Sequence, residues 1–395
     1  MKRFFSLFLA VALTLTLCAC GAQPKEVSYI AGQEDAAQLQ AVYSGRTAFH
    51  GEAHDHADTG GTSDGEQPLP VWKTMMAGLD MDFAVIVDHR QSLHMYLEEW
   101  DNAIFIGGSE AATTITDRPE GANRFHYNMI FADPKGLETV VTTFTEFKFR
   151  EWTEQDREGC GGQMHFNYPQ MNTARFNELI TAVKENGGMF VIPHPSSTNE
   201  SVPENPMELY FQDYIGLEVF YGCRMEDSNN FKTDENYKLW TDMLEKGARI
   251  WATAGNDDHR FPQTKCLTTV YSEEGSAFCH LEHLRVGDFT AGPVGVKMCI
   301  GDTPMGATGS FKDQRVVFSV GDFHKEIGLE KYTFVVKLLT DKGEVFTYEM
   351  KGNESLTFAV DADETVRFYR VEIFNKSLNK LTALGNPIWN EAKYQ

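Results

Sequence analysis

The sequence predicts an α/β protein, a TIM-like barrel followed by a small antiparallel β-sandwich. From Ser44 onward, short runs rich in Val, Ile and Phe alternate with stretches of helical length, which is typical of parallel strands buried on both faces. After about Gly292 apolar and polar residues alternate between turn signals, which is typical of an antiparallel sandwich. We therefore place the barrel at residues 44–291 and the sandwich at residues 292–395.

The composition is that of a folded protein, with 42% hydrophobic and 23% charged residues. The 57 acidic residues outnumber the 35 basic ones, which gives a net charge of -22. Because affinity for nucleic acids comes mainly from cations that neutralise phosphates, this charge argues against a nucleic-acid polymer as a partner. It does not exclude a small phosphorylated ligand, because bound metal ions can dominate the field of one pocket.

Residues 1–20 predict an export signal. Lys2 and Arg3 precede an apolar and hydroxyl run over residues 4–17, and small residues follow. The end of this segment resembles a bacterial lipobox, which implies lipidation at Cys20; an uncleaved transmembrane anchor is the alternative. We expect an exported protein at the bacterial cell surface or the periplasmic side, in contact with the membrane through its anchor only. Residues 21–43 are polar with little periodicity, and we expect a tether there.

The predicted barrel strands are followed by residues whose side chains bind metals. Four strands lead to His89, Glu110, His194 and Asp257, and His259 comes two residues after Asp257. In a parallel barrel these positions meet at the C-terminal rim, where barrel enzymes build their sites. The candidate strands are residues 82–87, 103–106, 126–132, 189–193, 215–220 and 248–254, with helices at 173–186 and 234–246.

The opening segment adds His54 and His56, which are two residues apart. In an extended strand such residues point to the same face, so both imidazoles can reach one ion. His50 precedes the pair at an interval that suits either a replacement ligand or a spare histidine. Histidine with carboxylate suits Zn, Mn or Fe, and a carboxylate such as Glu110 can bridge two ions. Bridged ions activate water, so the pattern indicates hydrolysis.

Taken in order, these motifs resemble the PHP family, named for polymerase and histidinol phosphatase domains, over about residues 48–260. The resemblance implies a distorted barrel of seven β/α units that hydrolyses phosphate mono- or diesters. Residues 283–296 and 381–390 further resemble a secreted branch that includes carbaryl hydrolase, which implies carboxyl or carbamate esters as the alternative. The matching residues are His54-Asp55-His56, Ser63-Asp64-Gly65, Asp88-His89, Glu110, His126, His194-Pro195 and Asp257-Asp258-His259.

The resemblance also implies three groups of metal ligands. The loop between His56 and Ser63 is longer than is usual in the family. The implied groups are His54, His56, Glu110 and Asp257 for one ion, Glu110, His126 and His194 for a second, and His89 and His259 with Asp64 nearby for a third.

We therefore expect a phosphoesterase that acts on a small molecule through a metal-activated hydroxide, with two or three divalent transition metals as cofactors. Asp257 is a catalytic candidate, and His194 or His259 is the candidate donor of a proton to the leaving group. Arg90 is placed to bind a phosphate oxygen, or else to form a salt bridge at a helix start. A lipoprotein that binds a metal or a glycan without turnover is the alternative from another class.

Three further residues have expected positions. Glu218 is a charge in an apolar strand, so we expect it to point into the barrel mouth and to form a hydrogen bond with the site. Asp88 is expected to orient His89 as a supporting carboxylate. His94 lies in a segment that reads as a helix, and we expect it at the surface or facing the substrate.

Overall fold

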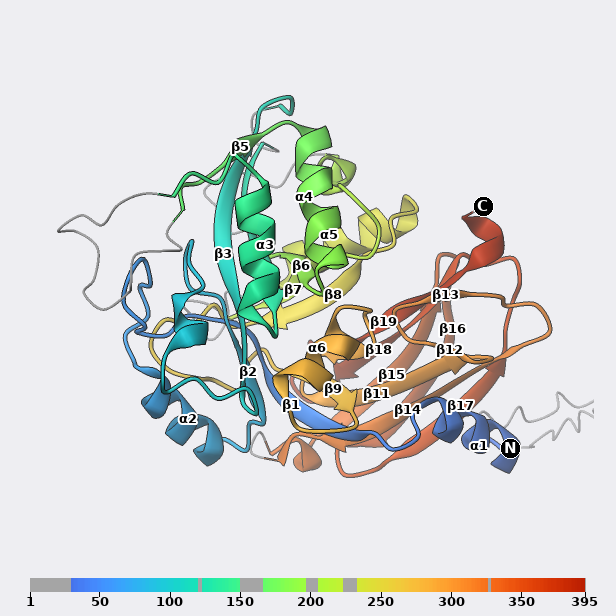
Figure 1. Cartoon of the computed structure of the whole chain (residues 1–395). Helices are drawn as coiled ribbons and strands as arrows, with labels where there is room; N and C mark the ends of the chain where they lie inside the picture. Colours follow the sequence, from blue (N-terminus) through green and yellow to red (C-terminus); the bar gives the residue numbers. More distant parts are fainter. Residues whose placement is uncertain are drawn as a thin grey trace, which may run out of the picture.

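A computed structural model describes residues 30–119, 123–149, 166–196, 205–222, 233–325 and 328–394. These residues form a mixed α/β structure with six α-helices, one sheet of fifteen strands and a second sheet of four (Figure 1). The expected α/β class is therefore confirmed, but the strands are not arranged as a closed parallel barrel within the described residues.

The first half of the large sheet carries the strands predicted before residue 260. Its strands lie in the order β1, β2, β3, β4, β6, β7, β8. The pairs on either side of β4 are antiparallel, and the other four pairs are parallel. The short connection from β3 to β4 explains this difference, because a parallel pair needs a crossover of a dozen or more residues. The bounds are β1 (Thr47–Asp55), β2 (Phe83–Ile86), β3 (Phe105–Ile115), β4 (Arg124–Phe131), β6 (Met189–Ile192), β7 (Gly216–Tyr221) and β8 (Trp251–Gly255).

The first and last strands of this half meet at their C-terminal ends. The amide of His56 donates to the carbonyl of Asp258 at 2.9 Å, and the amide of Asp257 donates to the carbonyl of His54 at 2.8 Å. A single parallel bridge joins Asp55 to Asp258. The N-terminal part of β1, residues 47–51, pairs with β9 instead, in antiparallel fashion. Strands β1 and β8 are therefore joined only where the candidate ligands lie.

Helices pack against this half of the large sheet. Helix α3 packs on β4, α4 on β6 and α5 on β7. Side-chain caps begin two of them, because Asp133 accepts from the amide of Lys135 and Asn172 from that of Arg175. Both predicted helices are confirmed, as α4 and α5. The helices are α1 (Gln33–Val42), α2 (Leu69–Gly78), α3 (Pro134–Thr143), α4 (Thr173–Glu185), α5 (Thr233–Glu245) and α6 (Ala277–Leu284), with 3₁₀ helices η1 (Leu93–Tyr96), η2 (Pro206–Leu209), η4 (Leu329–Lys331) and η5 (Glu391–Lys393).

The antiparallel strands expected after residue 292 are present in two sheets. Strands β9 and β10 connect β1 to β19, β18, β15 and β16, so the large sheet continues into this region. Val296 and Phe318 of the small sheet share one hydrophobic cluster with Val336 and Val371 of the large sheet. A separate sandwich stays a prediction. The strands are β5 (Gln170–Met171), β9 (Thr268–Ser272), β10 (Phe289–Ala291), β11 (Val294–Ile300), β12 (Thr303–Pro304), β13 (Thr308–Gly309), β14 (Arg315–Phe323), β15 (Thr333–Thr340), β16 (Gly343–Lys351), β17 (Leu356–Asp361), β18 (Phe368–Asn375) and β19 (Lys380–Asn390).

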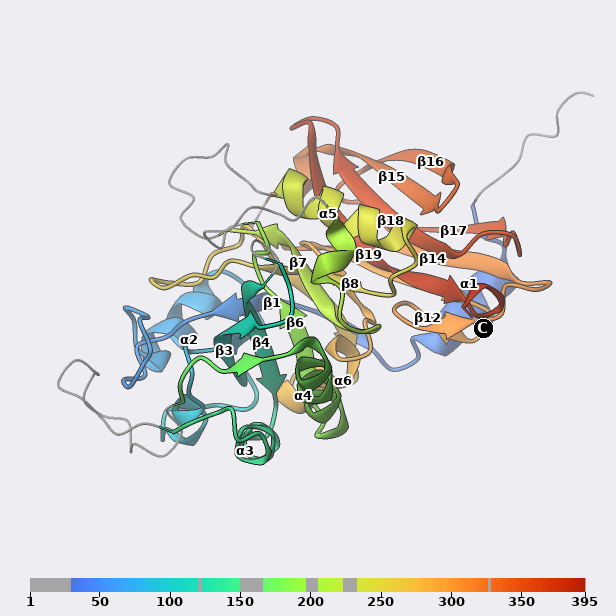
Figure 2. The ribbon, with the colours of Figure 1, turned by 90° about the horizontal axis from the view of Figure 1, so that it is seen from above.

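The two regions also contact each other through α5, which lies beside β18 (Figure 2). The hydroxyl of Tyr237 on α5 donates to the carboxylate of Glu372, and Arg367 donates to the carbonyl of Glu245 at the end of the helix. The buried Trp240 of α5 lies under the guanidinium of Arg370.

The N-terminal segment differs from the expected tether. Residues 33–42 form α1, and Leu39 and Tyr43, which are four residues apart, are buried against β14 and β17. Asp35 forms an ion pair of 2.7 Å with Arg315. The export signal and Cys20 lie outside the described residues, and their assignment stays a prediction. No helix among the described residues is long and apolar enough to cross a membrane.

Candidate metal centre

The histidines and carboxylates predicted from the strand ends lie together where β1 meets β8. They form two groups of four residues, and within each group one ligand atom per residue lies within 4.8 Å of all the others. The inner group is fully buried, and the outer group is partly open to solvent. The inner group is His54, Glu110, His194 and Asp257, and the outer group is His56, Asp64, His89 and His259.

Glu110 occupies the middle of the site and is only 1% exposed. We expected it after the end of a strand, but it lies within β3, because this strand continues to Ile115 in a hairpin with β4. Its two oxygens face different histidines. Oε1 lies 2.6 Å from His126 Nδ1 and 3.0 Å from His194 Nε2, whereas Oε2 lies 3.1 Å from His56 Nε2, 3.4 Å from His89 Nδ1 and 3.5 Å from His54 Nε2.

Asp257 closes the inner group from the side of β8. Its Oδ1 lies 3.1 Å from His56 Nε2 and 3.6 Å from His54 Nε2, and its Oδ2 accepts from the Tyr221 hydroxyl at 3.1 Å. The backbone of Asp257 is left-handed, with φ at 50°, and that of His194 has φ at 28°. Such conformations cost of order 1–3 kcal/mol in residues other than glycine and cluster at functional sites.

The outer group gathers around His56, whose ring stacks on those of His89 and His259 at centroid distances of 4.6 and 4.4 Å. Asp64 reaches the same place, with Oδ1 3.3 Å from His259 Nε2 and Oδ2 3.5 Å from His89 Nε2. The longer loop after His56 therefore still delivers Asp64. The grouping differs from the expected one in two ways. His56 lies past the end of β1 and its ring also faces the outer residues, and His126 belongs to neither group of four, although its Nδ1 lies 2.6 Å from Glu110 Oε1.

Glu218 supports the inner group from β7, as predicted. Its Oε1 accepts from His54 Nδ1 at 3.1 Å, and its Oε2 accepts from the backbone amide of His194 at 2.8 Å. The first contact fixes the tautomer of His54, so that Nε2 faces Glu110 and Asp257. Gly255 makes room for this pair, because a Cβ there would lie 2.3 Å from Glu218 Oε1 and 2.5 Å from His54 Cβ.

Two predicted residues have other roles. His94 is fully buried in η1, not at the surface, and its ring packs against Trp100. Asp88 does not orient His89: its Oδ1 accepts from the amide of Ala57 at 3.0 Å and its Oδ2 from the hydroxyl of Thr59. It therefore holds the loop that follows His56.

His50 joins neither group. Its Nδ1 lies 2.9 Å from the hydroxyl of Thr269, and its ring lies 5.2 Å from that of His324. Burial lowers the pKa of His50 to about 4, so the ring is neutral at physiological pH. Of the two interpretations of His50, the structure favours the spare histidine.

Tyr221 and Gly255 were not predicted as site residues, because no sequence signal distinguishes them from other aromatic residues and glycines.

The buried polar atoms of the site point to a cation. His54 Nε2, both ring nitrogens of His56 and Glu110 Oε2 are buried without a hydrogen bond of normal geometry to any described residue. Unpaired buried polar atoms are rare and need an explanation. These atoms converge, and imidazole nitrogens with carboxylate oxygens are the donors that Zn, Mn and Fe prefer. The residues therefore fit divalent transition metals.

Charges within the site compensate one another in the metal-free protein. Burial opposes the imidazolium form of His56, but the carboxylates of Asp257 and Glu110 outweigh burial and raise its pKa to about 9. Burial likewise opposes the charged form of His259, and the adjacent Asp64 raises its pKa to about 9. Burial disfavours the Glu110 carboxylate, but the surrounding histidines, His89 foremost, hold its pKa well below the usual range.

These shifts predict how the stability of the metal-free protein depends on pH. With a folded pKa of about 9 and an ordinary value of about 6.5, His56 contributes fully below pH 6.5 and loses its contribution as pH rises to 9. We expect the free energy of unfolding to fall by on the order of 3 kcal/mol over this range. Metal binding displaces these protons, so added Zn or Mn should stabilise more at pH 9 than at pH 6. Urea unfolding at pH 6 and pH 9, with chelator and with metal, measures these free energies. A metal-free protein with the same free energy of unfolding at both pH values would contradict the prediction.

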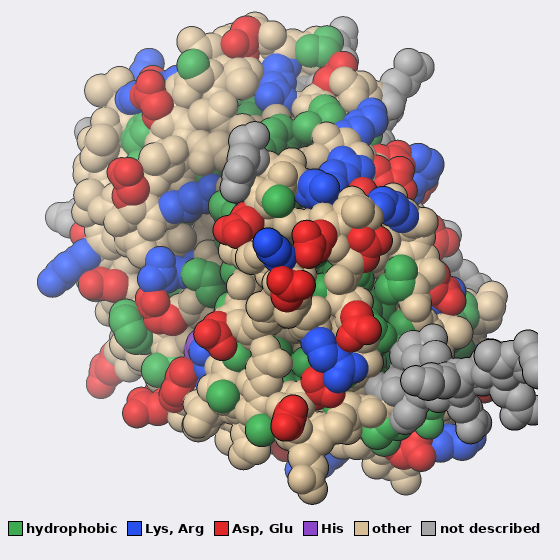
Figure 3. All heavy atoms as spheres, turned by 90° about the vertical axis from the view of Figure 1, so that its right-hand side faces the viewer, with side chains coloured by type: hydrophobic (Ala, Val, Ile, Leu, Met, Phe, Trp, Pro, Cys, Tyr) green, Lys and Arg blue, Asp and Glu red, His purple; other side chains and the backbone are tan. Residues whose placement is uncertain are grey.

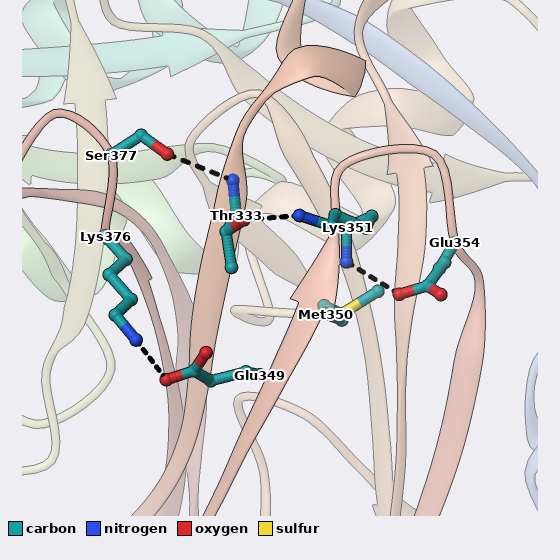
Figure 4. Close-up of a pocket in the computed structure, with 7 residues that line it drawn as sticks. All are labelled: Thr333, Glu349, Met350, Lys351, Glu354, Lys376 and Ser377. Carbon is teal, nitrogen blue, oxygen red and sulfur yellow. Dashed lines mark hydrogen bonds and ion pairs between the residues drawn. The ribbon is translucent and has the colours of Figure 1, made fainter.

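A second hollow lies away from the histidines, beside β15, β16 and β18 (Figure 4). Its volume is about 550 Å³, and its charged side chains have partners. Lys376 pairs with Glu349 at 2.5 Å, Lys351 Nζ donates to the Thr333 hydroxyl at 2.9 Å, and Glu354 accepts from the amide of Lys351 at 2.6 Å. Because none of the candidate ligands lines it, we do not assign it a role in the site.

On the face of the molecule drawn in Figure 3, acidic and basic side chains are interspersed.

No family model and no curated protein matches the sequence. Among solved structures, the chain is similar to the lesion-specific endonuclease PfuEndoQ from Pyrococcus furiosus, with a TM-score of 0.39 and 14% sequence identity. The similarity covers 61% of this chain and 56% of that one, so the chain spans just over half the length of PfuEndoQ. It is too distant to indicate an activity. The fold and the site define a mixed α/β protein with two residue groups able to hold metal ions.

Proposed function

We propose that this protein is a metal-dependent hydrolase of the PHP type that acts on a small phosphoester. One observation carries the proposal: the two oxygens of the buried Glu110 face separate sets of histidines, as a carboxylate that bridges two cations does. A centre that only stores one ion needs no bridging carboxylate. The order of the motifs along the chain supports the PHP assignment, and the net charge of -22 supports a small substrate over a nucleic-acid polymer.

Divalent ions at this site would activate water and neutralise charge on the ester. The residues of the chain hold and orient the groups around them. Glu218 keeps the proton of His54 on Nδ1, and the carbonyl of Asp257 accepts from His259 Nδ1 at 2.9 Å, so that each Nε2 faces the site. The hydroxyl of Tyr221 donates to Oδ2 of Asp257 and so fixes the orientation of this carboxylate.

The substrate enters from the side of the outer group. The side chains of Asp64 and His259 in the outer group are 52% and 28% exposed, whereas those of His54, Glu110 and His194 in the inner group are buried. Of the two proton donors considered for the leaving group, His259 lies on this open side and His194 is buried in the inner group. We propose that His259 is the donor when no ion occupies its Nε2.

The purified protein tests the proposal directly. It is stripped with chelator, refilled with Mn or Zn, and assayed with a chromogenic phosphodiester, phosphomonoester and carboxyl ester. We expect phosphoester cleavage that the chelator abolishes and the metal restores. Preference for the carboxyl ester would favour the carboxyl or carbamate esterase instead. Bound metal without turnover of any ester would overturn the proposal in favour of a binding protein.

We also propose that the protein is exported and lipid-anchored at Cys20. The first twenty residues alone support this, through the basic start, the apolar run and the lipobox-like end. Mass spectrometry of the mature N-terminus tests the proposal. A diacylglyceryl group on Cys20 is expected, and an unmodified chain that begins at Met1 would contradict it.

A further inference from the structure

Arg90 directly follows the outer-group residue His89 and is held in a strained conformation. Its φ is 57°, in the left-handed region that an arginine rarely adopts. Two backbone hydrogen bonds hold it: its amide donates to the carbonyl of Glu110 at 2.8 Å, and its carbonyl accepts from the amide of Phe166 at 3.2 Å. The backbone at this position is thus tied to the residue at the centre of the site.

The guanidinium of Arg90 has no anionic partner within the described part of the chain. The Cζ of Arg90 lies 4.7 Å from the centroid of the Tyr168 ring. The Nε of Arg90 is buried without a hydrogen bond to any residue that the structure describes. The expected salt bridge at a helix start is absent from the described residues. Most of the other described arginines have a carboxylate partner, although Arg118 and Arg124 have none among the described residues. The pairs are Arg46 with Asp288, Arg175 with Glu146, Arg249 with Asp213, Arg285 with Glu282, Arg315 with Asp35, Arg367 with Asp341 and Arg370 with Glu372.

We infer that Arg90, held by Tyr168, is a specificity-determining residue that binds an anionic oxygen of the substrate and so selects phosphoesters over uncharged carboxyl esters. The inference rests on the proposed function. A guanidinium is a planar fork that matches the oxygens of a phosphoryl group, and charge-assisted hydrogen bonds of this kind are about twice as strong as neutral ones. The guanidinium of Arg90 lies over the ring of Tyr168, and a guanidinium stacked on a ring can still donate through the N–H groups in its own plane.

The chemistry of the site gives this cation a role that the ligands do not fill. Both residue groups combine histidines with carboxylates, and Asp64, Glu110 and Asp257 bring negative charge to the place where a phosphoester would bind. Metal ions offset that charge at the reacting atoms. A fixed cation that follows His89 in the chain would offset the charge on substrate oxygens that the ions do not contact, which an uncharged ester does not require.

The test compares Arg90→Gln and Arg90→Lys with the wild type, all metal-loaded, on a phosphodiester and a neutral carboxyl ester with the same leaving group. For Arg90→Gln we expect kcat/KM on the phosphodiester to fall on the order of 100-fold, and that on the neutral ester to change less than about threefold. Arg90→Lys keeps the charge without the fork and should lie between. Inorganic phosphate, titrated by calorimetry, should bind the Arg90→Gln protein at least tenfold more weakly.

Arg260→Gln is the matched control. Arg260 also follows an outer-group histidine, but it is 60% exposed and lies 3.4 Å from Glu66, so we expect little change in either substrate. Metal content and melting temperature show whether each variant is folded. Wild-type phosphodiester turnover and phosphate affinity in both Arg90 variants would overturn the inference and leave the proposed function standing. A wild-type protein without chelator-sensitive turnover would overturn the proposed function. If the wild type and the Arg90→Gln protein then also bound phosphate with equal affinity, the inference would be overturned as well.

Discussion

Replacing Glu110 by glutamine is expected to lower metal-dependent kcat/KM by at least about a thousandfold, a loss of roughly 4 kcal/mol of transition-state stabilisation. The physical reason is the position of its carboxylate, whose oxygens lie within 3.5 Å of five histidines: two from each residue group, and His126. Glutamine keeps the shape but supplies one oxygen and no charge, so it cannot bridge two cations. We expect the metal content per chain to fall along with the activity.

The matched control for this change is Glu185→Gln, which alters an exposed glutamate at the end of α4. It should leave both metal content and turnover at wild-type levels. Elemental analysis and steady-state kinetics on the two variants measure the difference. A Glu110→Gln protein that is folded, carries the full metal content and retains wild-type turnover would remove the bridging carboxylate from the account.

Replacing Glu218 by glutamine is expected to weaken metal binding by about 10- to 100-fold. An amide cannot accept from both His54 Nδ1 and the amide of His194 with its two ends. In one case His54 changes tautomer, which turns an N–H toward the site. In the other case the buried backbone amide of His194 loses its acceptor at a cost of about 1–3 kcal/mol. Because His54 itself remains, excess metal should restore much of the turnover of Glu218→Gln, whereas it should not rescue Glu110→Gln.

Competition titrations with a metal indicator measure these affinities. Glu146→Gln serves as the control, since it breaks a partly exposed ion pair with Arg175 that lies outside the site. An unchanged metal affinity in Glu218→Gln would show that the carboxylate only fills space. A loss that excess metal does not restore would show that Glu218 has a role beyond the positioning of His54 and His194.

The strands were predictable from the sequence because their apolar runs are short, dense and followed by polar residues. The extent of β3 was not predictable, because Gly107 and Gly108 suggest a turn. In the structure these glycines serve close packing within the strand: a Cβ at Gly107 would lie 2.4 Å from Met95 Sδ, and one at Gly108 would lie 2.4 Å from the carbonyl oxygen of Met129. A single sequence does not distinguish these two uses of glycine.

Most members of the site were predictable from their places after apolar runs, and Asp64 was predictable only from the resemblance, but their grouping was not predictable. Which residues share a group depends on how each ring is turned, and the ring of His56 contacts the outer histidines as well as the inner carboxylates. The strand β4 was predicted, but its antiparallel direction was not, because the direction of a strand depends on its connection and not on its own residues. His94 was misplaced because a short 3₁₀ turn that buries a histidine gives no periodic signal.

Anomalous X-ray scattering from crystals of the metal-loaded protein, recorded at the absorption edge of the added Mn or Zn, tests the central claim most directly. The account predicts at least two peaks, one among His54, Glu110, His194 and Asp257 and one among His56, Asp64, His89 and His259, with Glu110 between them. Crystals saturated with either metal that show no peak at these residues would contradict it.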